Sequence, residues 1–292
     1  MLGKILFKSL ISSVKITIII FFLMVIVEFL EIKYNEKLKN KFKNNNLIQY
    51  SLASFMGIIP GCIATFAVDS LYMSGLVGFG AINAVMIATS GDEAFVMLSY
   101  AFDKSSNVSL NTVLFLFAIL FILGIIGGFL ADVYKKVFKL KLCDRCVIIH
   151  KEDHKIGKTP DFKHFIKVHI WKHIIKKHLI KLFLWLYASL FIIAILNSSF
   201  NLKALITNNK VIILFIGAII GILPISGPNL FFLSLFVQGT IPFSILLTNS
   251  IVQDGHGSLP LLSFSIEDTI KIKIFNIIFG VSIGLILLSL GF

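Results

Sequence analysis

The sequence has few charged residues for its length. Only 14% of its 292 residues are charged, whereas 57% are hydrophobic and the mean hydropathy is +0.93. Soluble domains average roughly 25% charged residues, so a water-soluble globular protein is excluded. Several apolar runs approach the ~20 residues that a helix needs to span a bilayer. We therefore predict an all-α integral membrane protein with about ten helical segments.

Cysteine is also scarce, and some familiar motifs are missing. Three cysteines (Cys62, Cys143 and Cys146) without a secreted pattern argue against a disulfide framework. The full phosphate-binding loop sequence Gly-x-x-x-x-Gly-Lys-Ser/Thr does not occur, because Gly157-Lys158-Thr159 has Glu152 where the first glycine is required. No His-Glu-x-x-His sequence occurs either. ATP hydrolysis by this chain is therefore not expected. The run Leu10–Leu30 is too long for the apolar core of a cleaved signal peptide and is expected to be the first span.

Acidic residues are fewer than basic residues, and the basic residues are concentrated in one segment. The chain has 27 Lys and Arg against 15 Asp and Glu, a net charge of +12. The segment Val133–Lys181 alone holds 14 basic and 4 acidic residues. One basic loop on an apolar protein is typical of a cytoplasmic loop rather than of a nucleic-acid surface. We predict a first membrane unit over residues 1–131, a basic cytoplasmic loop over 132–181 and a second membrane unit over 182–292, in the cell membrane.

The two predicted membrane units are related in sequence. A shift of 164 residues aligns Gly57-Ile58-Ile59-Pro60 with Gly221-Ile222-Leu223-Pro224, and Gly91 with Gly255. The ungapped register gives 11 identities over the 43 pairs from Gly57/Gly221 to Ser99/Ser263. Internal repeats are the strongest single guide to architecture, and proline and glycine are seldom shared by chance. The sequence therefore predicts two repeats, each with a full span, helices broken at Gly-x-x-Pro and again near Gly91 or Gly255, and a final span.

The lysines predict how the repeats are oriented. The link Glu31–Asn46 carries five lysines, whereas its counterpart Asn197–Lys210 carries two. This asymmetry places the first link in the cytoplasm and the second outside, so that the repeats are inverted. Lys271 and Lys273 then fall on the cytoplasmic side. Interrupted helices at corresponding positions of two repeats are typical of transporters with a substrate site at the membrane midplane.

Polar residues gather beside the second break of each repeat. Ionisable groups at membrane depth are functional candidates by default, because burying them is unfavourable. Oxygen ligands with one imidazole suit Mn²⁺ and similar metals, or a proton relay. The alternative is that these residues only cap short helices. The candidates expected to converge between the repeats are Asp92, Glu93, Asp254 and His256, aided by Thr89, Asn249 and Gln253.

The first break of each repeat is a second candidate region. Helix breaks leave carbonyl groups and helix N-termini free to face a substrate. Cys62 could be a thiolate ligand, or a small apolar filler as buried cysteines usually are. Asp69 is either on the substrate path or paired inside the helix bundle. The residues that break the helices here are Pro60, Gly61, Pro224 and Gly227, followed by Pro228 and Asn229.

The basic loop carries a third candidate. Cys143, Cys146, His150 and His154 match the ligand types of a structural zinc site, although the long spacer of a zinc finger is missing. The alternative is a positively charged loop that is merely rich in histidine. The segment Asp161–Lys181 is predicted to be a basic amphipathic helix lying on anionic lipid.

These motifs resemble those of the ten-helix heavy-metal exporters related to the organoarsenical permeases, whose members are labelled arsenic efflux proteins or manganese transporters. The matching strings are Gly57–Cys62, Ala88–Phe95, Gly221–Pro224 and Asn249–Gly255. Ile225-Ser226 and His256 depart from the family pattern, where Gly-Cys and an acidic residue are expected. The resemblance implies export of a metal or metalloid ion.

Three functions follow from these observations. The first is a secondary transporter that exports manganese or another divalent heavy metal in exchange for protons, with no cofactor for transport itself. The second is efflux of trivalent arsenic or organoarsenicals, for which Cys62 is the one thiol in the membrane part. The third, a remote alternative, is an intramembrane metal-dependent enzyme.

Overall fold

The computed structural model describes residues 6–7, 9–22, 25, 45–73, 75–103, 108–140, 142, 171, 179–199, 206 and 208–292. The proposed loop ligands Cys143, Cys146, His150 and His154 lie outside these described residues, as does nearly all of the predicted amphipathic helix. Residues 31–44 of the first lysine-bearing link and residues 200–205 and 207 of the second also lie outside them.

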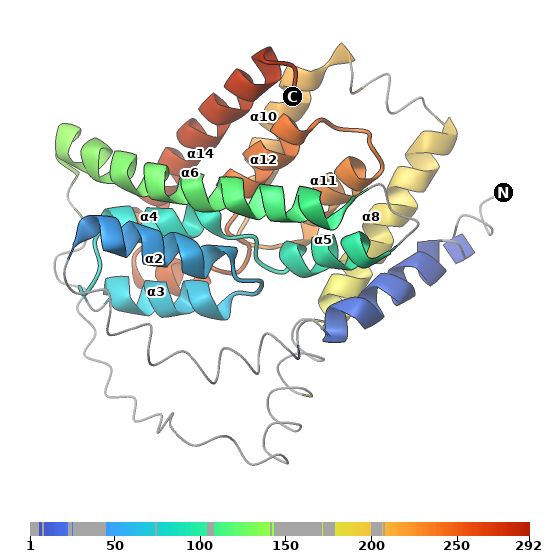
Figure 1. Cartoon of the computed structure of the whole chain (residues 1–292), viewed down its shortest axis with the longest axis horizontal. Helices are drawn as coiled ribbons and strands as arrows, with labels where there is room; N and C mark the ends of the chain where they lie inside the picture. Colours follow the sequence, from blue (N-terminus) through green and yellow to red (C-terminus); the bar gives the residue numbers. More distant parts are fainter. Residues whose placement is uncertain are drawn as a thin grey trace.

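All regular secondary structure in the described part of the chain is helical, which confirms the predicted all-α class. A helix over Ser9–Phe22 comes first. It is followed by α2 (Asn46–Ile58), α3 (Ile63–Met73), α4 (Phe79–Ala88), α5 (Glu93–Phe102), α6 (Leu110–Val137), α8 (Ile180–Ser199), α10 (Lys210–Gly221), α11 (Gly227–Val237), α12 (Phe243–Val252), α13 (Leu259–Phe264) and α14 (Ile266–Ser289). In Figure 1, α2, α3, α4 and α6 run side by side, and α10, α12 and α14 form a second, inclined group.

Three described segments are long and apolar enough to cross a membrane: Phe79–Phe102, which contains α4 and α5, then α6, and α14. Two of them carry large apolar side chains on their outer faces. On α14, Ile266, Ile270, Ile274 and Ile278 recur every four residues and are exposed. Such a stripe lies on one helix face, and an apolar face of this size suits lipid rather than water.

Helix α6 extends past the apolar run Val108–Leu130 and continues for seven more residues to Val137. The reason is local packing, because the ring of Tyr134 lies against the rings of Phe138 and Phe275 and holds the last turns in place.

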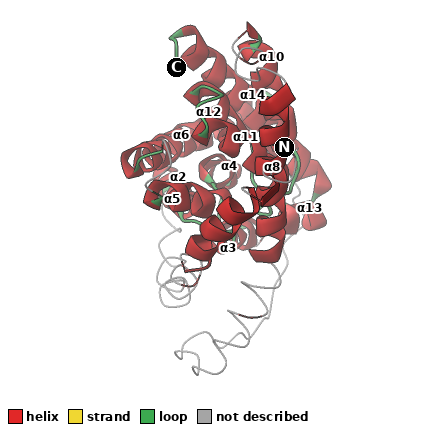
Figure 2. Ribbon diagram, turned by 90° about the vertical axis from the view of Figure 1, so that its right-hand side faces the viewer, coloured by secondary structure: helices red, strands yellow, loops and turns green. Residues whose placement is uncertain are grey.

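Helices α4 and α12 form the core of the molecule. Every residue of α4 is buried, as are the residues of α12 from Ser244 to Val252. Helix α4 lies against α2, α3, α6 and α12, and α12 lies against α10, α11 and α14. Figure 2 shows α4 in the middle of the molecule, surrounded by other helices.

Glycines let the long helices approach these two core helices closely. A Cβ atom added to Gly128 of α6 would lie 2.7 Å from the Gly80 carbonyl oxygen on α4. A Cβ atom added to Gly284 of α14 would lie 1.8 Å from Thr248 Oγ1 on α12. Small residues at helix interfaces allow this backbone-to-backbone packing inside membranes.

The described helices end at the breaks that proline and glycine predict. Helix α2 ends at Ile58, before Pro60, and α10 ends at Gly221, before Pro224. The breaks after α4 and α12 contain Gly91 and Gly255, whose φ angles are +49° and +51°. Glycine adopts such angles without strain, which allows the backbone to turn between two short helices.

Candidate functional site

The two breaks Thr89–Asp92 and Gln253–His256 lie beside each other in the centre of the molecule. The side-chain amide of Gln253 donates a hydrogen bond to the Thr89 carbonyl oxygen at 3.2 Å. The Thr89 hydroxyl is bonded in turn to that of Thr65 at 2.8 Å. All three side chains are buried. The two halves of the chain are thus joined by a polar contact at the place where each core helix ends.

The Asp92 carboxylate faces His256 from the other half. The distance between Asp92 Oδ2 and His256 Nδ1 is 3.9 Å, and Ser226 Oγ lies 3.4 Å from the same ring nitrogen. Asp92 and Ser226 are buried, whereas the His256 side chain is 27% exposed. Carboxylate, imidazole and hydroxyl groups therefore meet at one point that can be reached from outside the core.

The helix N-caps differ in whether the side chain of the N-cap residue caps its helix. The side chains of Asn45, Ser109 and Ser265 each accept a backbone N–H bond of their own helix, whereas that of the exposed Asn209 before α10 does not. The central N-cap residues of α5, α11 and α13 make no such bond. These residues are Asp92, Ser226 and Ser258. Since Asp92 is turned toward His256 instead of toward α5, its geometry favours a binding role over a capping role.

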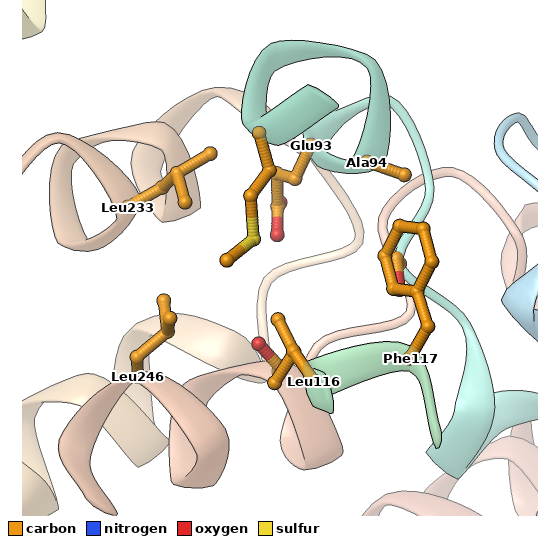
Figure 3. Close-up of a pocket in the computed structure, with 9 residues that line it drawn as sticks. Glu93, Ala94, Leu116, Phe117, Leu233 and Leu246 are labelled. Carbon is orange, nitrogen blue, oxygen red and sulfur yellow. The ribbon is translucent and has the colours of Figure 1, made fainter. Parts of the chain in front are cut away.

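Glu93 lies apart from this cluster. Its side chain points into a small pocket formed by α5, α6, α11 and α12, between Leu233, Leu246 and Leu116 (Figure 3). The pocket also contains Ser90 and Ser250 and holds about 10 Å³, roughly the room of one water molecule. Among the described residues, Glu93 Oε1 has no hydrogen-bond partner. Glu93 is thus a buried carboxyl group in a largely apolar setting.

Asp254 forms an ion pair that the sequence did not predict. Lys273 Nζ lies 2.6 Å from Asp254 Oδ1, and the two side chains are only 10% and 0% exposed. The sequence places Lys273 among the lysines of the cytoplasmic side, but in the structure it lies within α14 and is buried. The available signal was its position inside an apolar span, where a lysine is unfavourable without a partner.

Asn249 has a packing contact that its sequence position did not reveal. Its side-chain amide donates to the Gly217 carbonyl oxygen and to Asn229 Oδ1, both at 2.9 Å. These bonds connect α12 to α10 and α11. Asn229 is fully buried and was noted in the sequence only as part of the helix break.

Cys62 lies at the first break of the first half, and Asp69 lies on the helix that follows it. Cys62 is buried directly after Pro60 and Gly61, and the Gly61 amide donates to the Gly91 carbonyl oxygen at 3.2 Å, so the two breaks of this half touch. Asp69 lies on α3, one turn after Thr65, and is fully buried. Within the described residues, neither Asp69 oxygen has a hydrogen-bond partner.

The predicted ligands do not form one set. Within the described residues, no three His, Cys, Asp or Glu side chains are grouped so that they could hold a metal ion. The structure brings together Asp92 and His256 but leaves Glu93 in its own pocket and pairs Asp254 with Lys273. An ion bound at Asp92 and His256 would need further ligands from nearby hydroxyl groups or from the carbonyl groups that the helix breaks leave free.

The sequence of the chain matches the model of one known protein family. The model of a protein family described as "Putative, 10TM heavy-metal exporter" matches residues 6–198 and 167–290, which is most of the chain. Neither the curated proteins nor the solved structures gave a match.

Proposed function

The chain belongs to the family of ten-helix heavy-metal exporters, and we propose that it is a secondary transporter that exports a divalent metal ion, manganese or a similar one, in exchange for protons. The family and the apolar helices make it a multi-pass membrane protein of a transporter family rather than an enzyme family. The metal and the coupling ion are the parts that we propose.

The observation that carries this proposal is the meeting of Asp92 and His256 at the two central breaks. Oxygen and imidazole ligands favour divalent first-row metals over soft ions. Both groups also exchange protons, so a site of this composition can bind either a metal or protons. Competition between the metal ion and protons for this site is the simplest physical basis for exchange.

We further propose that the halves are inverted repeats related by a twofold axis through this site. Helices α11 and α12 have the bounds of α3 and α4 shifted by 164 residues, and the break glycines have matching positive φ angles. The contacts are reciprocal, since α5 lies against α11 and α13 lies against α3. Two aligned pairs, Thr89 with Gln253 and Asp92 with His256, meet each other. Contact between equivalent residues is expected only next to such an axis.

Arsenic efflux is the second candidate, and the position of Cys62 favours it. This thiol lies at the first break, where Gly61 contacts Gly91 next to Asp92. Thiolates prefer soft ions such as trivalent arsenic. A single thiol is a weak ligand set, and its aligned partner in the other half is Ser226, so we rank this function second.

A transport assay with a panel of ions tests the function. We expect the purified chain in proteoliposomes to move Mn²⁺, and to a lesser extent Zn²⁺ or Cd²⁺, several-fold faster when a pH gradient is imposed than when an ionophore collapses it. Empty liposomes measure the leak. Transport of arsenite or methylarsenite without transport of Mn²⁺ would replace the first function with the second, and transport of none of these ions would contradict both.

Labelling of single cysteines tests the inverted arrangement. In a cysteine-free background, we expect residues of the segment Asn197–Lys210 to react with an impermeant maleimide added outside intact cells. Residues of Glu31–Asn46 and of Val133–Lys181 should react only after the cells are opened. Reaction of both links from the same side would show parallel repeats and contradict the proposal.

A further inference from the structure

The buried ion pair between Lys273 and Asp254 is unusual for its position. The other described lysine on α14, Lys271, pairs with the exposed Glu267 at the start of the helix. Lys273 instead points inward and contacts a carboxylate that is fully buried. A buried ion pair is seldom stabilising compared with apolar side chains of similar size, because both charges lose their hydration. Its presence therefore calls for an explanation beyond packing.

The surroundings of the pair contain more negative charge than Lys273 can balance. Asp69 is fully buried on α3, one turn after Thr65, and a Cβ atom added to Gly257 in the turn that contains Asp254 would lie 2.8 Å from Thr65. Both oxygens of Asp69 and Oδ2 of Asp254 have no hydrogen-bond partner in the described part of the chain. Tyr72, one turn further along α3, is bonded to the Asp268 carboxylate on α14 at 3.0 Å, so α3 and α14 lie together here. Two buried carboxyl groups thus lie on adjoining elements, and of the two only Asp254 is paired with an ammonium group in the described part of the chain.

Neutral donors with unused bonding capacity lie on the same elements. Asn276 is three residues after Lys273 on α14, fully buried, and neither end of its amide is bonded within the described residues. Ser258, four residues after Asp254, does not cap α13, and its hydroxyl has no hydrogen-bond partner among the described residues. Carboxylate, amide and hydroxyl oxygens are the ligands that hard and borderline divalent cations prefer.

The residues equivalent to Lys273, Asp254 and Asp69 by the repeat alignment are uncharged, so the fold does not need these three charges. Gly280 and Gly284 pack on α12 as Gly124 and Gly128 pack on α4, which aligns α14 with α6 at a shift of 156 residues. With the shift of 156 residues, Lys273 of α14 corresponds to Phe117 of α6. With the shift of 164 residues that relates the other elements, Asp254 corresponds to Ser90 and Asp69 to Leu233. Phe117, Ser90 and Leu233 all line the pocket around Glu93. The related positions around Glu93 therefore carry three neutral side chains where Lys273, Asp254 and Asp69 carry charged groups.

We propose that Asp69 and Asp254 form a binding site for a divalent cation, and that Lys273 is a tethered cation that occupies this site until the ion displaces it. The inference rests on the proposed transport of a divalent metal. Two carboxylates balance the charge of such an ion, and a lysine on a flexible four-carbon stem can withdraw when the ion binds. Return of the ammonium group to Asp254 then helps to release the ion, so the buried lysine promotes turnover.

Metal binding to purified full-length variants tests the proposal. Lys273→Met removes the competitor, so we expect Mn²⁺ to bind at least about tenfold more tightly by titration calorimetry, a gain of about 1.4 kcal/mol. Flux at saturating Mn²⁺ should nevertheless fall, because release becomes slower. Lys273→Arg keeps a tethered charge and should bind Mn²⁺ about as the unmodified chain does. If Lys273→Met is too unstable without metal, Mn²⁺ should raise its unfolding temperature more than that of the unmodified chain.

The double variant Asp254→Asn with Lys273→Met separates this role from a structural one. Removing both charges avoids leaving one of them buried alone, so the variant should fold. We expect it to lose the Mn²⁺ bound at Asp69 and Asp254, and most of the flux, while the site at Asp92 and His256 still binds its ion. Normal flux in the double variant, or an unchanged Kd in Lys273→Met, would overturn the tethered-cation proposal and leave the transport function standing if the unmodified chain still moves Mn²⁺. Failure of the unmodified chain to bind or move any metal would overturn both.

Discussion

Replacing Asp92 with Asn is expected to lower metal flux at least tenfold while leaving the protein folded and inserted. The carboxylate lies 3.9 Å from His256 and makes no capping bond to α5. Asn has the same shape but no charge, so it preserves packing and removes the electrostatic attraction for a cation. A loss of about 1.4 kcal/mol in that attraction already corresponds to a factor of ten. Flux of Mn²⁺ into proteoliposomes, normalised to inserted protein, measures the effect.

The matched control is Glu267→Gln, which makes the same chemical change at an exposed site. Glu267 forms only a surface pair with Lys271, and such pairs contribute little to stability. We expect its flux to equal that of the unmodified chain. Equal flux in the Asp92→Asn variant would mean that Asp92 does not take part in transport. A low yield of folded Asp92→Asn would instead indicate a structural role, which size-exclusion profiles in detergent would reveal.

The contrast with Asp254 shows why the position alone does not define the role of a carboxylate. Asp92 and Asp254 each flank the glycine of a central break, on opposite sides of it, and the sequence suggests similar roles. In the structure Asp254 balances the buried Lys273, so Asp254→Asn leaves an uncompensated ammonium group inside the protein. Removing one partner of a buried pair costs about 3–5 kcal/mol. Asp254→Asn should therefore reduce folded yield as well as flux.

Much of the architecture could be predicted because it depends on local chemistry. Proline cannot continue a helix, and glycine tolerates the positive φ angles of the central turns, so Pro60, Pro224, Gly91 and Gly255 mark helix ends in the sequence itself. The all-helical class follows from the apolar composition in the same way. These features need no knowledge of which helix lies beside which.

The details of the candidate site depend on packing and could not be predicted. The ion pair of Lys273 joins α14 to the turn after α12 across 19 residues, and only the arrangement of those helices brings the atoms together. Glu93 and Asp92 point in different directions because they are neighbours at the start of a helix, but which helices each of them faces depends on packing. Glu93 consequently faces α6, α11 and α12, whereas Asp92 faces His256.

The close contact between α4 and α6 yields the second large expected effect, on stability. We expect Gly80→Ala to destabilise the protein by about 1–3 kcal/mol, the range for overpacking a well-packed core. The new Cβ atom would lie 2.5 Å from the Gly128 carbonyl oxygen and 2.5 Å from the Tyr50 ring. The higher helix propensity of alanine contributes only about 1 kcal/mol in the opposite direction. A change of side-chain rotamer cannot relieve a clash with a backbone atom, so the clash should dominate.

Gly78→Ala is the matched control, because it makes the same change two residues earlier. The nearest atom to its new Cβ would be Gln49 Oε1 at 3.9 Å, an ordinary contact with the end of a flexible side chain. Gly78 is the N-cap of α4 and has a negative φ, so alanine meets no clash there and loses only the N-cap preference for glycine over alanine, about 0.5–1 kcal/mol. Thermal unfolding in detergent, followed by tryptophan fluorescence, should show a larger loss for Gly80→Ala than for Gly78→Ala. Similar unfolding temperatures for both variants would mean that α4 and α6 are further apart than this packing requires, and would remove the glycine contacts as support for aligning α6 with α14.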